Sequence, residues 1–557
     1  MKKVNKTSKI LIIIALILTI FRILIQMKIP LFLQADAFYD DYLYVMYAKE
    51  LMQFNWLGDF SFISLAKGAS FSFFILGNYL LGIPYSLGLI LTYIFSIIIF
   101  ILSIKKLIKN KWFLFITYIY LLFSPVMFHA ENIQKVYRGG VLLSFALLVI
   151  SGIIGIYTRI NDNNKKQKFF YVILTSISLS FFWFLKEDSI WILPFVLGGL
   201  FITIINILKT KDNKKTKRKK IFLVIIPLIT LFLSINVYKS INYIKYGEYA
   251  VTDRNGTYFK EVISDLLLIE DENSDKNHWI TKDMLEKAYN VSPSFSKIKN
   301  SMDDKYSFWQ DQDGEIVGDI IYWAMKEAAN ESGIYDNGGK EANNYYKKVH
   351  EELQKAFDEN KLKKNNEIHL SSVVKGITKE EIPEYLKLMK DSEKVLLTHS
   401  EFDIGIYEAR GSNDNIALFN ELTMSQVVMP NSNKNIYKPS TYFINVSKKI
   451  VSLYQKIGYI MYYIFIITLI VFTINVVSNL FKKKINERNL SIYLIMLGLS
   501  VTCFAQFFGT TFFCRFLSFR KIYDYTSIIF PIIQILEIIS IYLIISNIKK
   551  ILKKKYL

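Results

Sequence analysis

The sequence predicts a mainly α-helical membrane protein: a polytopic bundle of about ten transmembrane helices with a large, mainly helical extracytoplasmic domain. Three observations support this fold class. Hydrophobic residues make up 52% of the 557 residues, which is too apolar for one soluble enzyme. Many of them lie in runs of about 20 residues, the length a helix needs to cross a hydrocarbon core about 30 Å thick. Lys and Arg outnumber Asp and Glu by 68 to 48, and the cations cluster in short runs between the apolar segments.

Ten apolar segments satisfy this length rule. The first follows the basic stretch MKKVNKTSK and shows no small-residue cleavage site, so we expect an uncleaved anchor there. The expected spans lie near 9–27, 84–104, 112–129, 140–158, 169–185, 190–208, 221–239, 456–478, 491–512 and 527–547.

The loop charges predict the orientation. With a cytoplasmic N-terminus, the short loops and ends assigned to the inside contain 29 Lys and Arg, and the short loops assigned to the outside, without the block at 240–455, contain 9. Both termini are therefore expected in the cytoplasm. This requires that FSFFILGNYLLG, at 71–82, lies flat in the outer interface instead of crossing the membrane. The expected regions are a transmembrane core at 1–239 with a first external loop at 28–83, an external domain at 240–455, and C-terminal transmembrane helices at 456–557.

The polar block at 240–455 is rich in Asn, Asp, Lys and Glu and contains amphipathic stretches. Tyr345, Val349, Leu353 and Phe357 share one helix face, so we expect a soluble helical domain that covers the membrane site and selects an acceptor. The stretch GEIVGDIIYWAM, at 314–325, has no assigned chemistry. DQDG, at 311–314, is interpreted as a turn because it lacks the bidentate Glu of a calcium loop.

Several other classes of protein are excluded. The two cysteines, Cys503 and Cys514, lie in or beside an apolar stretch, so neither a disulfide scaffold nor a cysteine zinc site is expected. The histidines do not form an H-E-x-x-H motif. The cationic run at 214–220 is interpreted as a topology determinant that contacts anionic lipid, and no nucleic-acid partner is expected.

The first external loop contains an acidic pair beside the membrane, Asp40 and Asp41. Apolar residues follow at helical spacing from Tyr44 to Met52, so the acids are expected at the start of an amphipathic interfacial helix. One interpretation is structural, with Asp40 as a helix cap stabilised by the helix dipole. The other is functional, since carboxylates at a low-dielectric boundary need a cation, a metal or a substrate hydroxyl nearby.

The pattern of Asp40, Asp41 and Tyr44 in the first external loop resembles that of the integral-membrane GT-C glycosyltransferases. This superfamily includes the protein O-mannosyltransferases and the lipid A aminoarabinose transferases. Lys67 and Gly68 look like the lysine-containing turn of the second family. KEDS, at 186–189, resembles an acidic turn of bacterial members, with Lys and Ser where those members have Arg and Gly. This turn supplies Glu187 and Asp188 as candidate accessory acids of the site.

The resemblance implies a polyprenyl-phosphate sugar as donor and an envelope glycan, glycolipid or protein as acceptor. Nucleotide sugars are cytoplasmic, and the sequence has no G-x-G-x-x-G fingerprint for one. Asp40 matches the catalytic base of the family. Asp41 would orient it or help to hold a divalent cation, Mg²⁺ or Mn²⁺, which only some GT-C enzymes require. The candidate ligands of the donor phosphate are the outward-facing cations Lys67, Arg138, Arg515, Arg520 and Lys521.

Two other functions remain open at this stage. A transporter or flippase of lipid-linked glycans would also use outward-facing cations, but should show charges within several spans and internal repeats. A non-catalytic membrane anchor for an external binding domain would tolerate replacement of Asp40 and Asp41. For each cation, binding to lipid headgroups is the structural alternative. The Lys-, Asn- and Ile-rich composition is typical of a low-GC bacterium.

Overall fold

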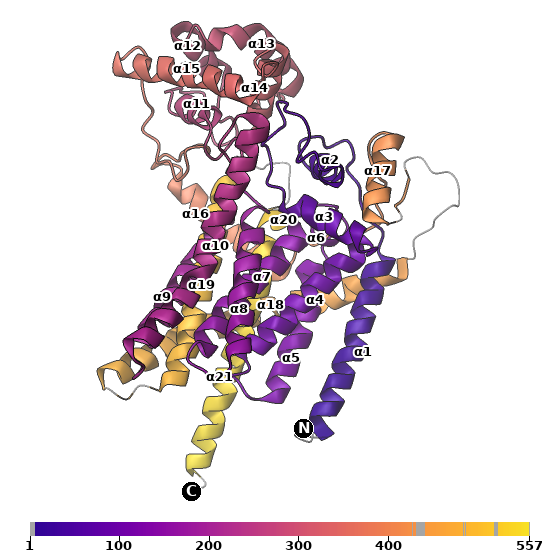
Figure 1. Ribbon diagram of the computed structural model, residues 1–557, viewed down its shortest axis with the longest axis vertical. Helices are drawn as coiled ribbons and strands as arrows, with labels where there is room; N and C mark the ends of the chain where they lie inside the picture. Colours follow the sequence, from indigo (N-terminus) through magenta and orange to yellow (C-terminus); the bar gives the residue numbers. More distant parts are fainter. Residues whose placement is uncertain are drawn as a thin grey trace.

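The computed structural model describes residues 6–425, 427–429, 441–482, 484, 486–516 and 522–555. These residues are mainly helical, and their β pairing consists of isolated bridges. A bundle of long helices carries a smaller group of helices at one end (Figure 1). The first helix begins and the last helix ends at the opposite end of the bundle (Figure 1). The predicted mainly helical class is confirmed.

Eight of the described helices are long and apolar enough to cross a membrane, which indicates a membrane-embedded protein. Large hydrophobic side chains are exposed along several of them, as expected for surfaces that face lipid. The eight segments are α1 (Lys6–Lys28), α4 (Tyr85–Ile104), α7 (Gly139–Arg159), η2 with α9 (Ser189–Ile192 and Leu193–Leu208), α10 (Lys214–Tyr246), α18 (Thr441–Phe481), α19 with η4 (Glu487–Phe513 and Cys514–Phe516), and α20 with η5 and α21 (Tyr523–Thr526, Ser527–Ile529 and Phe530–Lys555).

Two of the ten expected spans are not among these eight. The segment predicted at 112–129 forms α5 (Lys111–Leu122), which has 12 residues. The segment predicted at 169–185 forms α8 (Lys165–Trp183), whose first turn contains three lysines. Both helices pack within the bundle. The apolar segment predicted to lie flat forms α3 (Ser70–Leu80), whose 11 residues give a length of about 16 Å, too short for a hydrocarbon core of about 30 Å.

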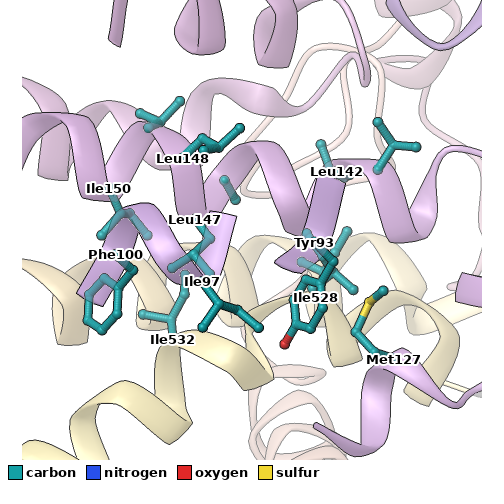
Figure 2. Packing of buried hydrophobic residues seen from close by; sticks show 14 of the residues in the cluster. Tyr93, Ile97, Phe100, Met127, Leu142, Leu147, Leu148, Ile150, Ile528 and Ile532 are labelled. Atoms are coloured by element: carbon teal, nitrogen blue, oxygen red, sulfur yellow. The ribbon is translucent and has the colours of Figure 1, made fainter. Parts of the chain in front are cut away.

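The core of the bundle is built around α7, the most buried of the eight long helices. Its side chains pack against α4 on one side and α8 on another. Figure 2 shows Ile97 and Phe100 of α4 close to Leu147 of α7, with Ile532 of α21 beside them. This packing holds the end of α7, which carries Arg138, in a fixed position relative to the loops around it.

The smaller group of helices has its own hydrophobic core and is called the cap here. This core extends from Phe259 to Tyr385 and also contains Phe512 and Phe516 of the bundle. Buried residues between 396 and 427 belong instead to the core of the bundle, so the predicted external segment 240–455 divides between two cores. The remaining helices are α2 (Asp41–Met52), η1 (Pro125–Met127), α6 (Ala130–Ile133), α11 (Tyr258–Leu267), α12 (Lys282–Val291), η3 (Phe295–Ile298), α13 (Lys299–Trp309), α14 (Ile320–Glu331), α15 (Gly339–Asp358), α16 (Ile382–Thr398) and α17 (Asn413–Thr423).

Candidate functional site

The predicted acidic pair lies at the start of α2, at the end of the bundle that carries the cap (Figure 1). Asp40 directly precedes α2, but its side chain makes no capping hydrogen bond. Its Oδ1 instead forms an ion pair with Lys67 Nζ at 2.9 Å and accepts a hydrogen bond from the Tyr137 hydroxyl at 3.0 Å. The Asp40 side chain is 35% exposed. It is therefore a charged group that a substrate can reach, and the capping interpretation is not supported.

Gly68, the residue after Lys67, fixes the lysine by close backbone packing. A Cβ at position 68 would lie 2.3 Å from the carbonyl oxygen of Phe184, so only glycine permits this approach. Phe184 directly follows α8 and lies three residues before Glu187. The turn that carries Lys67 is thereby held against the turn that carries the accessory acid.

Arg138 connects three of the motifs identified in the sequence. Its Nη1 donates to the Tyr44 hydroxyl at 2.9 Å and to the two carboxylate oxygens of Glu187 at 3.1 and 3.0 Å. It also donates to the carbonyl oxygen of Leu185 at 3.3 Å. Both charged side chains are largely buried, which makes this pair electrostatically stronger than a surface pair. The aromatic residue of the GT-C-like pattern thus positions a cation.

Cations surround Asp40 and keep it ionised. Burial raises the pKa of Asp40, but Lys67, Lys135 and Arg138 outweigh burial and hold that pKa well below its ordinary value. Glu187 shows the same balance. Burial raises the pKa of its carboxyl, and Arg138 and Lys67 overcome that effect and lower it to about 2. Both carboxylates are therefore negatively charged at neutral pH.

Asp41 has a different environment from its neighbour. Its side chain is 0% exposed, and neither of its oxygens accepts a hydrogen bond from the described residues. Lys135 Nζ lies 3.5 Å from its Oδ1 and 3.4 Å from Glu131 Oε2. Burial raises the pKa of Asp41 to about 7, with Lys135 opposing and the negative charge of Asp40 adding to the rise. Since Asp41 is inaccessible, it can act on the site only through its neighbours.

Replacement of Asp41 by Asn is expected to change how stability depends on pH. The folded carboxyl keeps its proton up to about pH 7, whereas an unfolded aspartate loses it near about pH 4. The contribution of this group to wild-type stability therefore falls as the pH rises through that window. Asp41→Asn cannot ionise, so its melting temperature relative to wild type should rise between about pH 5 and pH 7 and then level off. A difference that is independent of pH would contradict the raised pKa.

The cap contributes a cation that the sequence analysis did not identify. Arg254 Nη1 pairs with Asp319 Oδ2 at 2.9 Å, and its guanidinium lies over the rings of Tyr322 and Trp323. Arg254 is close enough to Glu187 to lower the pKa of that carboxyl. The stretch at 314–325, which had no assigned chemistry, therefore positions Arg254.

A ring contact joins the cap to the segment that carries the acidic pair. Trp323 stacks on Tyr39 with ring centroids 4.4 Å apart, and the Tyr39 hydroxyl donates to Glu327. The backbone N–H of Asp253 donates to the carbonyl oxygen of Leu65 at 2.9 Å. These contacts attach the cap next to both Asp40 and Lys67.

The other residues selected from the sequence do not join this group or lie outside the described residues. Asp188 pairs with Lys186 and is half exposed. Arg515 donates to the carbonyl oxygens of Lys375 and Gly376 at 2.6 and 2.9 Å, and these contacts lie away from the group around Asp40. Arg520 and Lys521 lie outside the described residues. Lys135 and Tyr137, in contrast, contact the acidic pair, and their proximity to Arg138 in sequence could have identified them.

The residues of the acidic pair do not fit a divalent cation. Mg²⁺ binds about six oxygen ligands, including carboxylates, whereas here a lysine ammonium accompanies each carboxylate of the pair. A different group in the cap, His278, Asp311 and Asp313, places three metal-capable atoms together. His278 Nε2 already pairs with Asp311 at 3.0 Å, and the predicted turn is present at Asp311. We therefore assign no metal to the site around Asp40.

In chemical terms, the site presents one accessible carboxylate beside several fixed cations. Such a set can accept a proton from a hydroxyl and bind a phosphate at the same time. No family model, curated protein or solved structure matches this chain.

Proposed function

We propose that this protein is an inverting membrane glycosyltransferase of GT-C type. It moves a sugar from a polyprenyl-phosphate donor to an extracytoplasmic envelope acceptor, which is a glycan, a glycolipid or a protein. One observation carries the proposal: the accessible carboxylate of Asp40 pairs with Lys67, and Arg138, which pairs with Glu187, is near enough to lower the pKa of Asp40. These residues come from separate segments at one end of a bundle of apolar helices. A lipid-linked phosphate donor is the substrate that such a position and charge pattern would suit.

The proposed reaction is a single displacement. The oxygen of the acceptor hydroxyl attacks the anomeric carbon while its proton passes to Asp40. The bond between that carbon and the phosphate oxygen breaks, and the polyprenyl phosphate leaves with the electron pair. Lys67, Arg138 and Arg254 balance the negative charge that develops on the phosphate. One displacement inverts the configuration of the anomeric carbon.

The ion pair between Asp40 and Lys67 gives the donor a second role. While Lys67 lies 2.9 Å from Asp40, the carboxylate is strongly stabilised and is a weak base. A donor phosphate competes for the ammonium of Lys67. Its binding would therefore release Asp40 and raise the pKa of that carboxyl toward the value that a base needs.

The orientation follows from the same assignment. The site end of the bundle would face outward, and the opposite end, where α1 begins and α21 ends, would face the cytoplasm (Figure 1). This agrees with the 29 cations in the short loops and ends assigned to the inside and the 9 in the short loops assigned to the outside.

The direct test uses the full-length protein in lipid vesicles. Polyprenyl phosphates that carry different single sugars are added with an envelope extract as acceptor, and the release of free polyprenyl phosphate is measured with and without the protein. Release that depends on both protein and acceptor is expected for one donor. Protein-driven movement of an intact donor across the vesicle membrane, with no release, would instead favour the transport function.

Gly68→Ala is expected to lower the rate of this reaction on the order of 100-fold, because a shift of about 1 Å in a catalytic group has an effect of that size. The added Cβ must push the Lys67 turn away from Phe184. Gly77→Ala is the matched control, since a Cβ at position 77 meets no atom within 4 Å and alanine favours a helix. Donor turnover is compared at equal protein abundance. Equal rates for the two variants would show that Gly68 does not position Lys67.

A further inference from the structure

Two cavities lie in the bundle, away from the site around Asp40 and toward the end opposite the cap. An apolar cavity of about 220 Å³ opens between α7, α9 and α19. Its walls include Ile153 of α7, Phe195 and Ile202 of α9, and Leu497 and Val501 of α19. Since these are helices long and apolar enough to cross a membrane, the cavity lies at the level of lipid chains.

A polar cavity of about 550 Å³ adjoins the apolar one. Its lining includes three cations, Lys106, Lys109 and Arg488, and one carboxylate, Glu487. Lys106 pairs with Asp162, and Arg488 donates to the carbonyl oxygen of Leu107. Lys109 is exposed and has no ion pair with any described residue. The cavity therefore carries an excess of positive charge, with one cation free to bind a ligand.

The two cavities adjoin at Tyr157, and together they are called the groove here. Tyr157 lines both of them. On α9 the apolar cavity includes Ile202 and the polar cavity Asn206, one turn further on. On α19 the corresponding residues are Leu494 and Ser491. The groove thus passes from an apolar stretch within the bundle to a cationic chamber at its end.

This groove is separate from the site around Asp40. Arg138 precedes α7, and the nearest groove residue on this helix is Ile153, so about 22 Å of helix separates the two sites. A ligand in the groove cannot contact the acidic pair.

Two glycines give the groove its width. A Cβ at Gly198 would meet nothing within 4 Å, so this position faces open space. A Cβ at Gly498 would meet only the ring of Phe195, at 3.0 Å. A larger side chain at Gly198 would therefore occupy the groove without displacing the backbone.

We propose that this groove binds an anionic phospholipid of the membrane leaflet opposite the cap. Its phosphate lies beside Lys109 and Arg488, and one acyl chain follows α9 and α19 over Gly198. The apolar walls would suit a chain and the excess of cations an anionic headgroup, and basic chambers between membrane helices are typical binding sites for such headgroups. This inference does not depend on the proposed function.

The test is lipid titration of the full-length protein in detergent, with bound lipid measured by native mass spectrometry. Phosphatidylglycerol is expected to bind more tightly than phosphatidylcholine of the same chain length, because only the former has a net negative charge. sn-Glycerol 3-phosphate, which has no acyl chain, is expected not to bind at matched concentrations. Equal binding of the two lipids, or equal binding of the chain-free phosphate, would overturn the proposal.

Two variants with a matched control locate the lipid. Lys109→Ala is expected to weaken phosphatidylglycerol binding about fivefold, the effect of about one positive charge near a lipid surface. Lys105→Ala, which removes an exposed lysine outside the groove, should leave the affinity unchanged. Gly198→Leu is expected to weaken binding about tenfold by displacing the chain, with an unchanged melting temperature in lipid-free detergent. Equal effects of Lys105→Ala and Lys109→Ala, or full binding by Gly198→Leu, would show that the lipid binds elsewhere.

Discussion

Asp40→Asn is expected to reduce glycosyl transfer on the order of 10²- to 10⁴-fold, the contribution typical of a general base. Asparagine retains the shape of the side chain and can still accept the hydrogen bond from Tyr137, but it cannot take the proton of the acceptor. Asp40→Asn leaves Lys67, whose side chain is 11% exposed, without its carboxylate partner, so some loss of stability is expected as well. The expected result is folded protein that does not turn over donor when rates are compared at equal protein abundance.

The measurement compares wild type and Asp40→Asn for donor turnover in vesicles, and for restoration of the surface glycan profile in a deletion strain. Membrane abundance is measured alongside. Asp36→Asn is the matched control, since Asp36 lies in the same loop but pairs with Arg410 near the surface. Full restoration of the glycan profile by Asp40→Asn would contradict the proposed chemistry and favour a transport or anchoring role.

Arg138→Ala is expected to destabilise the protein by about 3–5 kcal/mol, the range for breaking a buried ion pair. The substitution leaves Glu187 charged, largely buried and without its guanidinium partner. It also removes the donor to the Tyr44 hydroxyl. Donor turnover should be lost as well, because Arg138 is a proposed ligand of the donor phosphate.

Unfolding in detergent, followed by helix content, measures this effect. Arg410→Ala is the matched control, because Arg410 is 60% exposed and its partner Asp36 is also near the surface. Replacement of Arg410 should change the free energy of unfolding by about 1 kcal/mol or less. A double variant with Arg138→Met and Glu187→Gln should be more stable than Arg138→Ala, since no unpaired charge remains. Equal stabilities of Arg138→Ala and Arg410→Ala would contradict the buried pair.

The features that could be predicted from the sequence are those that depend on local patterns. Apolar runs predicted the long helices because burial in lipid depends on length and composition. The helical spacing of the apolar residues from Tyr44 to Met52 predicted a helix that begins at the acidic pair, and α2 begins at Asp41. Short motifs also selected Lys67, Arg138 and Glu187, which lie together because the ends of α2, α7 and α8 meet.

The features that could not be predicted depend on contacts between distant segments. Arg254 reaches the site only because Asp319 and Trp323, more than 60 residues further along, hold it. Arg515 was selected for its expected side of the membrane, but membrane side does not determine lateral position. Its guanidinium donates to the carbonyl oxygens of residues 375 and 376, away from Asp40. The pKa shifts of Asp40 and Asp41 also depend on such contacts. Lys67 lowers the pKa of Asp40, whereas burial outweighs Lys135 and raises the pKa of Asp41.

The salt link between Lys67 and Asp40 has a consequence for the timing of the proposed reaction. An activated sugar is lost whenever water reacts in place of the acceptor. With Lys67 at 2.9 Å, the carboxylate is occupied in the resting protein, and the phosphate of an arriving donor would draw the ammonium away. The donor would therefore have to bind before the acceptor. An order of addition with the donor first, visible in initial-rate patterns, would be the kinetic signature of a single lysine that protects its neighbour.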